Sequence, residues 1–233
     1  MNVEILYEDE DIIVCVKPYG MPVQGDKSRD IDLLSYLKNH VFETEELEVE
    51  PYLAMVHRLD RPVGGVMVFA KNQEAAADLS DQVQDGTMVK FYQAVLTGEL
   101  PDECGMLMDY LVRDGKTNTS KVVQKGTKGA KKAQLEYEVL DVFETDKGIL
   151  SYVLIELITG RHHQIRVQMA NRGCGIYGDT KYNPLFAKTK KKYQQIALFA
   201  TRLEFEHPAT GEHMVFKREP EGDAFEVIEL DEE

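Results

Sequence analysis

The sequence predicts an α+β fold built as a single domain over residues 1–233. Short segments with strand-like patterning outnumber segments with helical periodicity. The two kinds of segment do not alternate regularly, as they would in a parallel α/β sheet. No repeat, low-complexity linker or sharp change in composition divides the chain. We therefore expect one sheet-based domain with few helices.

The amino-terminal region predicts two strands and a helix. Residues 3–7 and 12–16 have the composition of short strands, and the acidic run Glu8–Asp11 between them forms a turn. Asp30 is placed to cap a helix whose apolar side chains recur at helical spacing. These apolar residues are Leu33, Leu34, Leu37 and Val41.

The next region predicts a strand, a helix and a second strand. Residues 66–70 are apolar and form a buried strand. Asn72 is placed to cap a helix that Gly86 ends. Alternation over residues 88–96 predicts a strand with Lys90, Tyr92, Ala94 and Leu96 on one face.

The middle of the chain predicts a basic connection, two strands and a third helix. Residues 113–132 are basic and rich in glycine, which favours a long, mobile hairpin or loop. Residues 135–139 alternate strictly, and residues 149–158 form another strand. Thr159-Gly160 then turns into a helix of about three turns, which Gly173 ends.

The carboxy-terminal region predicts a loop, a strand, a hairpin and a tail. Residues 177–187 form the loop and residues 195–199 the strand. Residues 203–205 and 214–216 pair as a hairpin across the turn that follows His207. The acidic residues from about 219 to 233 form a tail.

The charge of the chain is −14 and its pI about 4.9, which by itself disfavours a nucleic acid partner. The charge is uneven, however. Acidic residues crowd 43–50 and 219–233, whereas basic residues crowd 113–132 and 181–192. Local potential decides where a phosphate chain binds, so a nucleic acid partner is not excluded. Each basic run can equally be a solvated loop.

The location of the chain is predicted from its cysteines and its apolar runs. Three widely spaced cysteines fit a reducing cytoplasm and match no zinc-binding pattern. No apolar run approaches the roughly 18 residues of a membrane span. The first residues lack the basic and apolar segments of a secretory signal. We expect a cytoplasmic chain with no membrane partner.

One loop carries the strongest candidate for chemistry. His57-Arg58-Leu59-Asp60-Arg61 places a carboxylate between two arginines. A proline, the glycine pair Gly64-Gly65 and a buried strand follow. The guanidinium groups favour the ionised form of Asp60. Gly64 and Gly65 allow close approach of backbone or ligand. The alternative is a structural carboxylate that pairs with Arg58 or Arg61.

Four motifs, in order along the chain, resemble the pseudouridine synthases of the RluA branch. They span nearly all of the sequence, which makes the resemblance stronger than one loop would. The motifs are His57–Arg61, Lys90–Ala94, Thr159–Arg166 and Gly178–Tyr182.

The resemblance implies a fold, an activity and a partner. The fold is a long mixed or antiparallel sheet with a central cleft and flanking helices. The activity is isomerisation of uridine to pseudouridine in rRNA or tRNA, with no cofactor and no metal. We expect a monomer with no RNA-binding domain before the catalytic region, because the matching sequence begins almost at residue 1.

The resemblance also implies catalytic residues. Asp60 is the candidate nucleophile, because a carboxylate can attack the sugar or stabilise the positive charge that develops on it. Arg166 is expected to hold Asp60 ionised and in position. Tyr92 offers a ring for stacking and a hydroxyl for proton transfer at C5. Each residue has a structural alternative, in an ion pair, on a helix surface or in the core.

Four further residues are expected to bind the substrate: Arg58, Arg61, Arg161 and Leu198. Arg58 is placed to occupy the stack that a flipped base leaves. Arg161 supports the turn before the helix or contacts phosphate. Leu198 resembles an apolar residue that packs against the target base, and core packing is the alternative.

Two other features call for interpretation. His162 and His163 suggest a metal site, but adjacent residues on a helix point about 100° apart, so we expect no metal. We expect His163 to hydrogen-bond to backbone. Asn183 stands where the family often has glycine, and we expect it to adopt a left-handed backbone conformation.

Two other functions compete with RNA isomerisation. The first is a non-catalytic RNA-binding or RNA-chaperone protein with the same fold. The second is a hydrolytic nucleosidase that uses Asp60, although such enzymes usually pair two carboxylates and the sequence offers only Asp60 in a motif-like setting.

Overall fold

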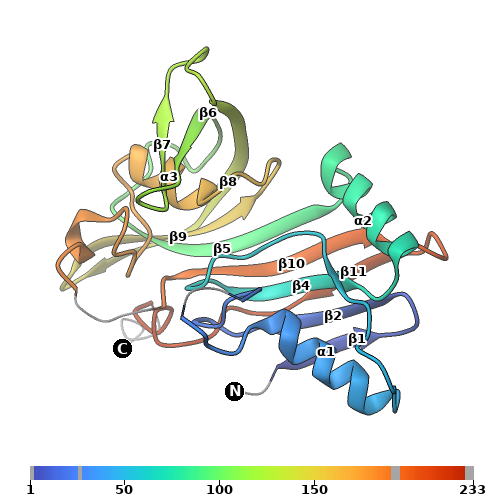
Figure 1. Cartoon of the computed structure of the whole chain (residues 1–233). Helices are drawn as coiled ribbons and strands as arrows, with labels where there is room; N and C mark the ends of the chain where they lie inside the picture. The colour runs from blue at the N-terminus through green and yellow to red at the C-terminus, as the bar shows by residue number, and fades with distance from the viewer. Residues whose placement is uncertain (1–2, 26–27, 190–194, 229–233) are drawn as a thin grey trace. The chain divides into compact units, whose positions relative to one another are not determined.

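A computed structural model describes residues 3–25, 28–189 and 195–228 (Figure 1). The described residues form eleven strands, three α-helices and one 3₁₀ helix. The chain divides into two compact units, Met1–Val89 with Ala200–Glu219, and Lys90–Phe199 with Pro220–Glu233. The predicted α+β class is confirmed. Whether the two units act as one domain, and the predicted central cleft, stay predictions.

The strands of the first unit lie in the order β1-β2-β4-β10, with β3 beside β4 and β11 beside β10. β2 is antiparallel to β1 and to β4, and β11 is antiparallel to β10. The two strands and turn predicted at its start are confirmed, as is the hairpin of β10 and β11. The strand predicted over 195–199 is not a separate strand, because β10 is continuous from Leu198. The strands are β1 (Glu4–Glu8), β2 (Ile12–Lys17), β3 (Ala54–Met55), β4 (Gly64–Ala70), β10 (Leu198–Glu206) and β11 (His213–Lys217).

Two capped helices belong to this unit, α1 (Leu33–Thr44) and α2 (Gln73–Asp85). The predicted cap Asn72 is confirmed, because its side chain accepts a hydrogen bond from the Ala75 N–H at 2.8 Å. The predicted cap of α1 is wrong. Asp32, not Asp30, accepts the bond from Ser35, and the helix begins accordingly later.

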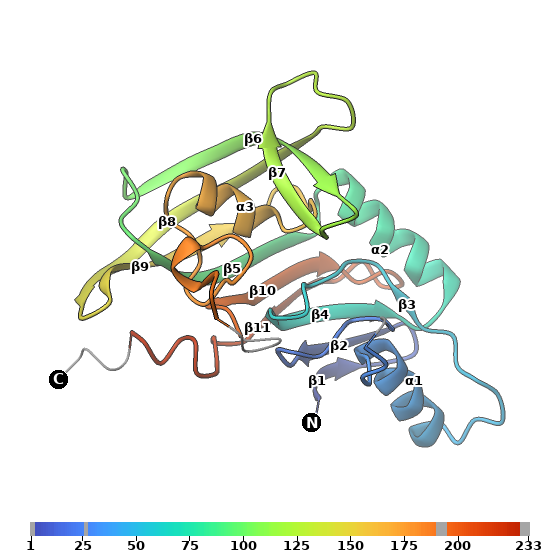
Figure 2. The ribbon, with the colours of Figure 1, turned by 60° about the vertical axis from the view of Figure 1, so that its left-hand side comes forward.

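The core of the first unit lies between α2 and its strands. Apolar side chains of β2, β4 and β10 pack there against Ala75 and Leu79 of α2. β4 is buried along its whole length, as the apolar run predicted. The other helix, α1, lies beside β1 and β2 in both views (Figures 1 and 2), and His40 binds Glu8 across that contact.

The second unit contains a strand order of β5-β9-β8-β6-β7. The pairings among these strands are antiparallel. Tyr92, Ala94 and Leu96, which were predicted to share a face of β5, are buried, and so is Val95 between them. The strands are β5 (Val89–Thr97), β6 (Cys104–Asp114), β7 (Thr119–Val123), β8 (Lys131–Thr145) and β9 (Gly148–Glu156).

The basic segment 113–132 forms a hairpin, which was one of its two predicted alternatives. It contains β7, which pairs with β6 across a tight turn, and the start of β8. β8 has 15 residues, three times the length predicted from residues 135–139 alone. Exposed strand ends of mixed polarity carry no alternation, so their pairing partner, and not their own pattern, makes them strands.

The third helix, α3 (Gln164–Asn171), is shorter than predicted. It has 8 residues, about two turns, in place of three. His163 precedes it with a positive φ of 55°, so His162 and His163 lie outside the helix. Both views place α3 beside β6 and β7 (Figures 1 and 2), where Val167 packs on Leu111 and Ala133. The predicted loop 177–187 includes the 3₁₀ turn η1 (Pro184–Phe186).

No helix in the described part of the chain is long and apolar enough to cross a membrane. The basic run 181–192 falls partly on residues 190–194, which lie outside the described ranges, as does the end of the acidic tail from residue 229.

Gly65 is required where β4 passes β10. Its φ is +130°, and a Cβ built on it would lie 2.4 Å from the carbonyl oxygen of Ala200 and 2.5 Å from the Ala200 nitrogen. Both atoms belong to the backbone of β10 and cannot move aside cheaply. The predicted close approach of backbone at this glycine is therefore confirmed.

Replacing Gly65 with alanine is expected to destabilise the fold by about 3 kcal/mol or more, because both the clash and the backbone conformation are unfavourable. Gly115→Ala is the matched control. Nothing lies within 4 Å of its added Cβ, and its φ is not positive. Urea unfolding of both variants measures the difference, and an equal, small effect in both would contradict the analysis of Gly65.

Candidate active site

Asp60 lies in the tight loop that leads into β4. Its carbonyl oxygen accepts a hydrogen bond from the Val63 N–H at 3.0 Å, which closes the turn. Leu59 and Val63, on either side, are buried and anchor the loop in the first unit. At the base of the loop, the Val68 N–H donates to Nε2 of His57 at 3.2 Å. The loop is thus a rigid support for the carboxylate of Asp60.

Lys17 holds the chain immediately after Asp60. Its side chain is fully buried, and Nζ donates to the carbonyl oxygens of Met21 at 2.8 Å, Pro18 at 2.9 Å and Arg61 at 3.3 Å. Burial lowers the pKa of Lys17 to about 7, and the negative charge of Asp60 opposes that shift. The cation therefore joins the loop 17–22 to the candidate nucleophile.

The side chain of Arg61 also connects the Asp60 loop to the chain near residue 20. Its Nε donates to the carbonyl of Gly20 at 2.8 Å, and Nη1 donates to the hydroxyl of Ser28 at 3.0 Å. A further ion pair joins it to Asp30, the residue wrongly predicted as a helix cap. These bonds give Arg61 a structural role, and its predicted contact with the substrate stays a prediction. Arg58 is exposed, and its predicted role also stays a prediction.

Arg166, on α3 in the second unit, forms a buried bidentate ion pair. Its Nε donates to Oδ2 of Asp179 at 2.7 Å and its Nη2 donates to Oδ1 at 2.8 Å. The side chains of Arg166 and Asp179 are 4% and 0% exposed, so both charges are withdrawn from water. The backbone N–H groups of Lys181 and Tyr182 also donate to Asp179 Oδ1. The guanidinium plane of Arg166 is fixed by this geometry.

Tyr182 and His163 complete the surroundings of Arg166. The guanidinium carbon of Arg166 lies 5.2 Å from the centre of the Tyr182 ring. The Tyr182 hydroxyl oxygen accepts the Ser120 N–H at 2.7 Å and lies 2.7 Å from Nδ1 of His163. His163 was predicted to bond to backbone, but this partner is a side chain. Burial and the charge of Arg166 lower the pKa of His163 to about 2, so it is neutral.

Arg161 supports the turn before α3, which confirms one of the two roles predicted for it. Its N–H donates to Oε1 of Gln164 at 3.0 Å, and its Nε donates to the carbonyl of Lys132 at 2.8 Å. Gln164 also accepts from the Thr159 hydroxyl and donates to the Gln134 carbonyl. The turn is therefore pinned to β8. Contact of Arg161 with phosphate stays a prediction.

Tyr92 and Leu198 are both buried in the second unit. Tyr92 is 5% exposed on β5, opposite Ile155 of β9, and Leu198 is 4% exposed at the start of β10. Their burial fits either the core or the wall of a site. Asp60 belongs to the first unit, so its predicted approach to Tyr92 and Arg166 stays a prediction.

Sequence reasoning missed several residues that shape these surroundings, among them Lys17, Asp179 and Tyr182. Asp179 and Tyr182 lie in the motif Gly178–Tyr182, which was recognised but given no role. Asn183 was predicted to be left-handed and is not, with φ −99°. Its buried amide nitrogen instead donates to Thr97 Oγ1 and to two backbone carbonyls.

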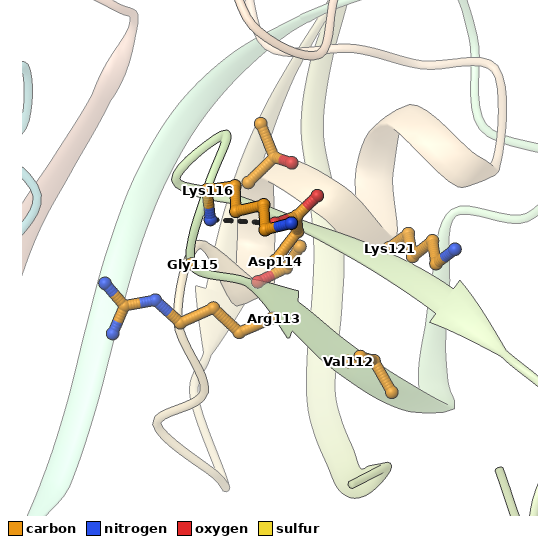
Figure 3. Close-up of a pocket in the computed structure, with 8 residues that line it drawn as sticks. Val112, Arg113, Asp114, Gly115, Lys116 and Lys121 are labelled. Carbon is orange, nitrogen blue, oxygen red and sulfur yellow. Dashed lines mark hydrogen bonds between the residues drawn. The ribbon is translucent and has the colours of Figure 1, made fainter. Parts of the chain in front are cut away.

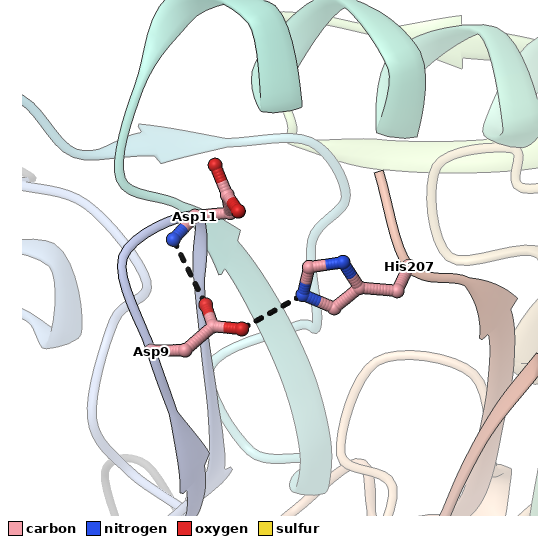
Figure 4. Close-up of side chains that lie close together, drawn as sticks. All are labelled: Asp9, Asp11 and His207. Carbon is pink, nitrogen blue, oxygen red and sulfur yellow. Dashed lines mark hydrogen bonds and ion pairs between the residues drawn. The ribbon is translucent and has the colours of Figure 1, made fainter. Parts of the chain in front are cut away.

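Asp9, Asp11 and His207 of the first unit lie close enough together to suggest a metal site (Figure 4). Their hydrogen bonds give a different account. Nδ1 of His207 accepts from the backbone N–H groups of Ala209 and Thr210, so Nε2 carries the proton and donates to Asp9 at 2.8 Å. A nitrogen that carries its proton cannot ligate a metal, so this group fastens two turns together.

Comparison with known proteins identifies the family. Residues 11–171 match the family described as RNA pseudouridylate synthase. The chain belongs to the RNA pseudouridine synthases. As a member, it is an isomerase of the class that acts on RNA. The predicted family is thereby confirmed.

Individual relatives agree with this assignment. The RNA pseudouridine synthase YlyB of Bacillus subtilis (strain 168) is 33% identical over 232 residues, which cover 98% of this chain and 73% of that protein. A protein of Pseudomonas aeruginosa named ribosomal large subunit pseudouridine synthase D is 32% identical over 225 residues, 92% of this chain and 67% of its own.

A solved structure confirms the fold of an RNA pseudouridine synthase. Human RNA pseudouridylate synthase domain containing 4 superposes with a TM-score of 0.75 at 26% identity, and the match covers 97% of this chain and 91% of that one.

The buried amine of Lys17 predicts a pH dependence of stability. The pKa of Lys17 is about 7 in the folded chain and near 10.5 when unfolded, so unfolding takes up a proton between these values. The free energy of unfolding therefore rises with pH across this window and is flat below it. Lys17→Met removes the effect, so the wild type is expected to gain stability over the variant from pH 7 to pH 9.

Urea unfolding at several pH values measures that difference. Lys217→Met, which removes an exposed lysine of β11, is the control and is expected to change with pH as the wild type does. If the wild type and Lys17→Met ran parallel from pH 7 to pH 9, the lowered pKa of Lys17 would be refuted.

Proposed function

We propose that this enzyme converts uridines of large-subunit ribosomal RNA to pseudouridine, and that Asp60, Tyr92 and Arg166 carry the reaction. Asp60 is the nucleophile, and Arg166 keeps it ionised and oriented. Tyr92 stacks on the base and handles the proton at C5. No metal or cofactor takes part, and the enzyme acts as a monomer in the cytoplasm.

The reaction is an isomerisation, so the proposed roles must balance within one nucleotide. The bond between N1 of uracil and C1′ breaks, the base turns, and C5 bonds to C1′. The proton on C5 leaves, and N1 ends with a proton. The carboxylate of Asp60 assists either by attack or by stabilising the charge on the sugar. Neither route requires a second carboxylate.

The observation that carries the proposal is the anchoring of the Asp60 loop. Lys17 donates to the carbonyl of Arg61, and the side chain of Arg61 donates to the carbonyl of Gly20. The residue that follows Asp60 is therefore bound twice to the loop 17–22, within a motif that resembles the family. Such anchoring serves a reacting group, which must be held to within a fraction of an ångström. The ribosomal RNA is proposed from the names of relatives in Pseudomonas aeruginosa and Neisseria meningitidis, both ribosomal large subunit pseudouridine synthase D.

Asp60→Asn is expected to abolish the activity, because it keeps the size of the side chain and removes the charge. Release of tritium from RNA labelled at C5 of uridine measures turnover. We expect the rate to fall by about a thousandfold or more. Asp81→Asn, an exposed carboxylate on α2, is the matched control and is expected to leave the rate unchanged.

Three outcomes of that assay would contradict the proposal. Tritium release by Asp60→Asn at the wild-type rate would remove Asp60 from the reaction. Binding of RNA by the wild type without release from any ribosomal or transfer RNA would favour an RNA-binding or chaperone function. Free uracil among the products would indicate a hydrolytic nucleosidase.

A further inference from the structure

Residues of β6, β7 and the turn between them line an open hollow of about 560 Å³, and none of the proposed catalytic residues lines it. Figure 3 shows its cations: Arg113 and Lys121 point away from each other across the hairpin, and Lys116 lies at the turn. Among the described residues, the eight that line the hollow include no aromatic side chain. They are Val112, Arg113, Asp114, Gly115, Lys116, Thr119, Ser120 and Lys121.

The charge of this segment is opposite to that of the chain. Residues 113–132 contain seven basic and one acidic side chain, whereas the whole chain contains 27 basic and 41 acidic ones. The remainder therefore has 20 basic and 40 acidic side chains, and it repels a polyanion. A phosphate chain approaches where the local potential is positive, which favours this hairpin over the acidic remainder. The other basic run, 181–192, lies partly outside the described residues.

The single acidic residue of the segment is engaged within its own turn. Oδ1 of Asp114 accepts the N–H groups of Lys116 at 2.8 Å and Thr117 at 3.4 Å. These bonds lower the pKa of Asp114 and hold its carboxylate against the turn. Arg113 donates to Oδ1 of Asn118 at 3.2 Å. This partner is an uncharged amide, so the bond does not neutralise the charge of Arg113. Asp114 also interacts with the charge of Lys121, but one carboxylate offsets only part of the charge of the three cations that line the hollow.

The back of the hairpin is fixed to the scaffold that carries Arg166. Nζ of Lys181 donates to the carbonyl of Asn118 at 2.9 Å, and Ser120 bonds to His162 and to the hydroxyl of Tyr182. The ring of Tyr182 lies under the guanidinium of Arg166. The position of a ligand bound in the hollow is therefore fixed relative to Arg166.

We propose that the β6–β7 hollow binds the phosphate backbone of the substrate RNA through Arg113, Lys116 and Lys121. This proposal rests on the proposed function, because it takes RNA as the substrate. Lysine ammonium groups contact phosphates, and the hollow has no aromatic platform on which bases could stack. The hollow accordingly contributes affinity and register, and it does not read the sequence of the RNA.

The double variant Lys116→Ala/Lys121→Ala tests the proposal, with binding of unmodified large-subunit ribosomal RNA measured over a series of salt concentrations. Each lost phosphate contact reduces the slope of log Kd against log salt by about one, so the double variant is expected to lose about 1.5–2 of slope. Binding is expected to weaken about tenfold at ~0.1 M salt, for RNAs of any sequence.

Lys217→Ala is the matched control for Lys121→Ala, because both remove an exposed lysine from a strand. It is expected to keep the wild-type slope. With turnover measured alongside, the hairpin variants are expected to raise KM and leave kcat unchanged. An unchanged slope in the double variant, or an equal loss in Lys217→Ala, would overturn the proposal.

The same assays separate this proposal from the proposed function. A reduced slope together with no pseudouridine from the wild type supports the docking surface and refutes the activity. Pseudouridine from the wild type together with unchanged binding by the double variant does the reverse. Loss of binding to poly-glutamate with RNA binding intact would assign the hollow to an acidic protein and overturn the proposal.

Discussion

The second unit is arranged around the charge of one buried guanidinium. Withdrawing Arg166 from water costs several kilocalories per mole unless an anion and well-directed hydrogen bonds replace the solvent. Asp179 supplies both through two bonds of 2.7 and 2.8 Å. Its carboxylate in turn needs the N–H groups of Lys181 and Tyr182, which fixes the loop after Gly178. The conformation of that loop is a consequence of the buried charge.

The same constraint extends from this loop to β7. Tyr182 lies under the guanidinium, and its hydroxyl accepts the N–H of Ser120. His163 adds no positive charge beside Arg166, because its lowered pKa keeps the imidazole neutral. A second charge there would be repelled by the first. His163 has a left-handed backbone conformation, so α3 begins only after it. The same residue is bonded to Tyr182 through its ring.

The first unit solves a similar problem with a different cation. Lys17 is buried without a carboxylate among its described hydrogen-bond partners, which are three backbone carbonyls. Such partners satisfy the donors but do not neutralise the charge, and the pKa falls accordingly. In return, the amine joins a segment near residue 20 to the turn of Asp60. Both units thus use a buried cation to fix a loop that carries a motif of the family.

The parts of the fold that the sequence predicts are those determined locally. Asn72 and Gly86 bound α2 because their preferences act within one turn of helix. The hairpin of β10 and β11 follows from two alternating runs and a short turn. Prediction fails where a distant partner decides. The start of β8 is a strand because β6 pairs with Lys131 and Lys132, and α3 starts late because His163 is held in place from outside the helix.

The candidate site divides in the same way. The motif around Asp60 is visible in the sequence, but the contact of Lys17 with Arg61 spans 44 residues and leaves no local pattern. Arg166 was recognised, whereas its partner Asp179 was only part of a motif without a role. Arg61 shows the opposite error, because the position of an arginine beside a reactive carboxylate does not distinguish a substrate contact from an internal one.

The central claim is that a single carboxylate, Asp60, on a loop anchored through main-chain carbonyls, isomerises uridine in ribosomal RNA. A map of pseudouridines in large-subunit ribosomal RNA tests it most directly, made from cells that lack this chain and from the same cells supplied with the wild type or with Asp60→Asn. The account predicts that at least one pseudouridine disappears without the chain and returns only with the wild type. An unchanged map, or full restoration by Asp60→Asn, would contradict it.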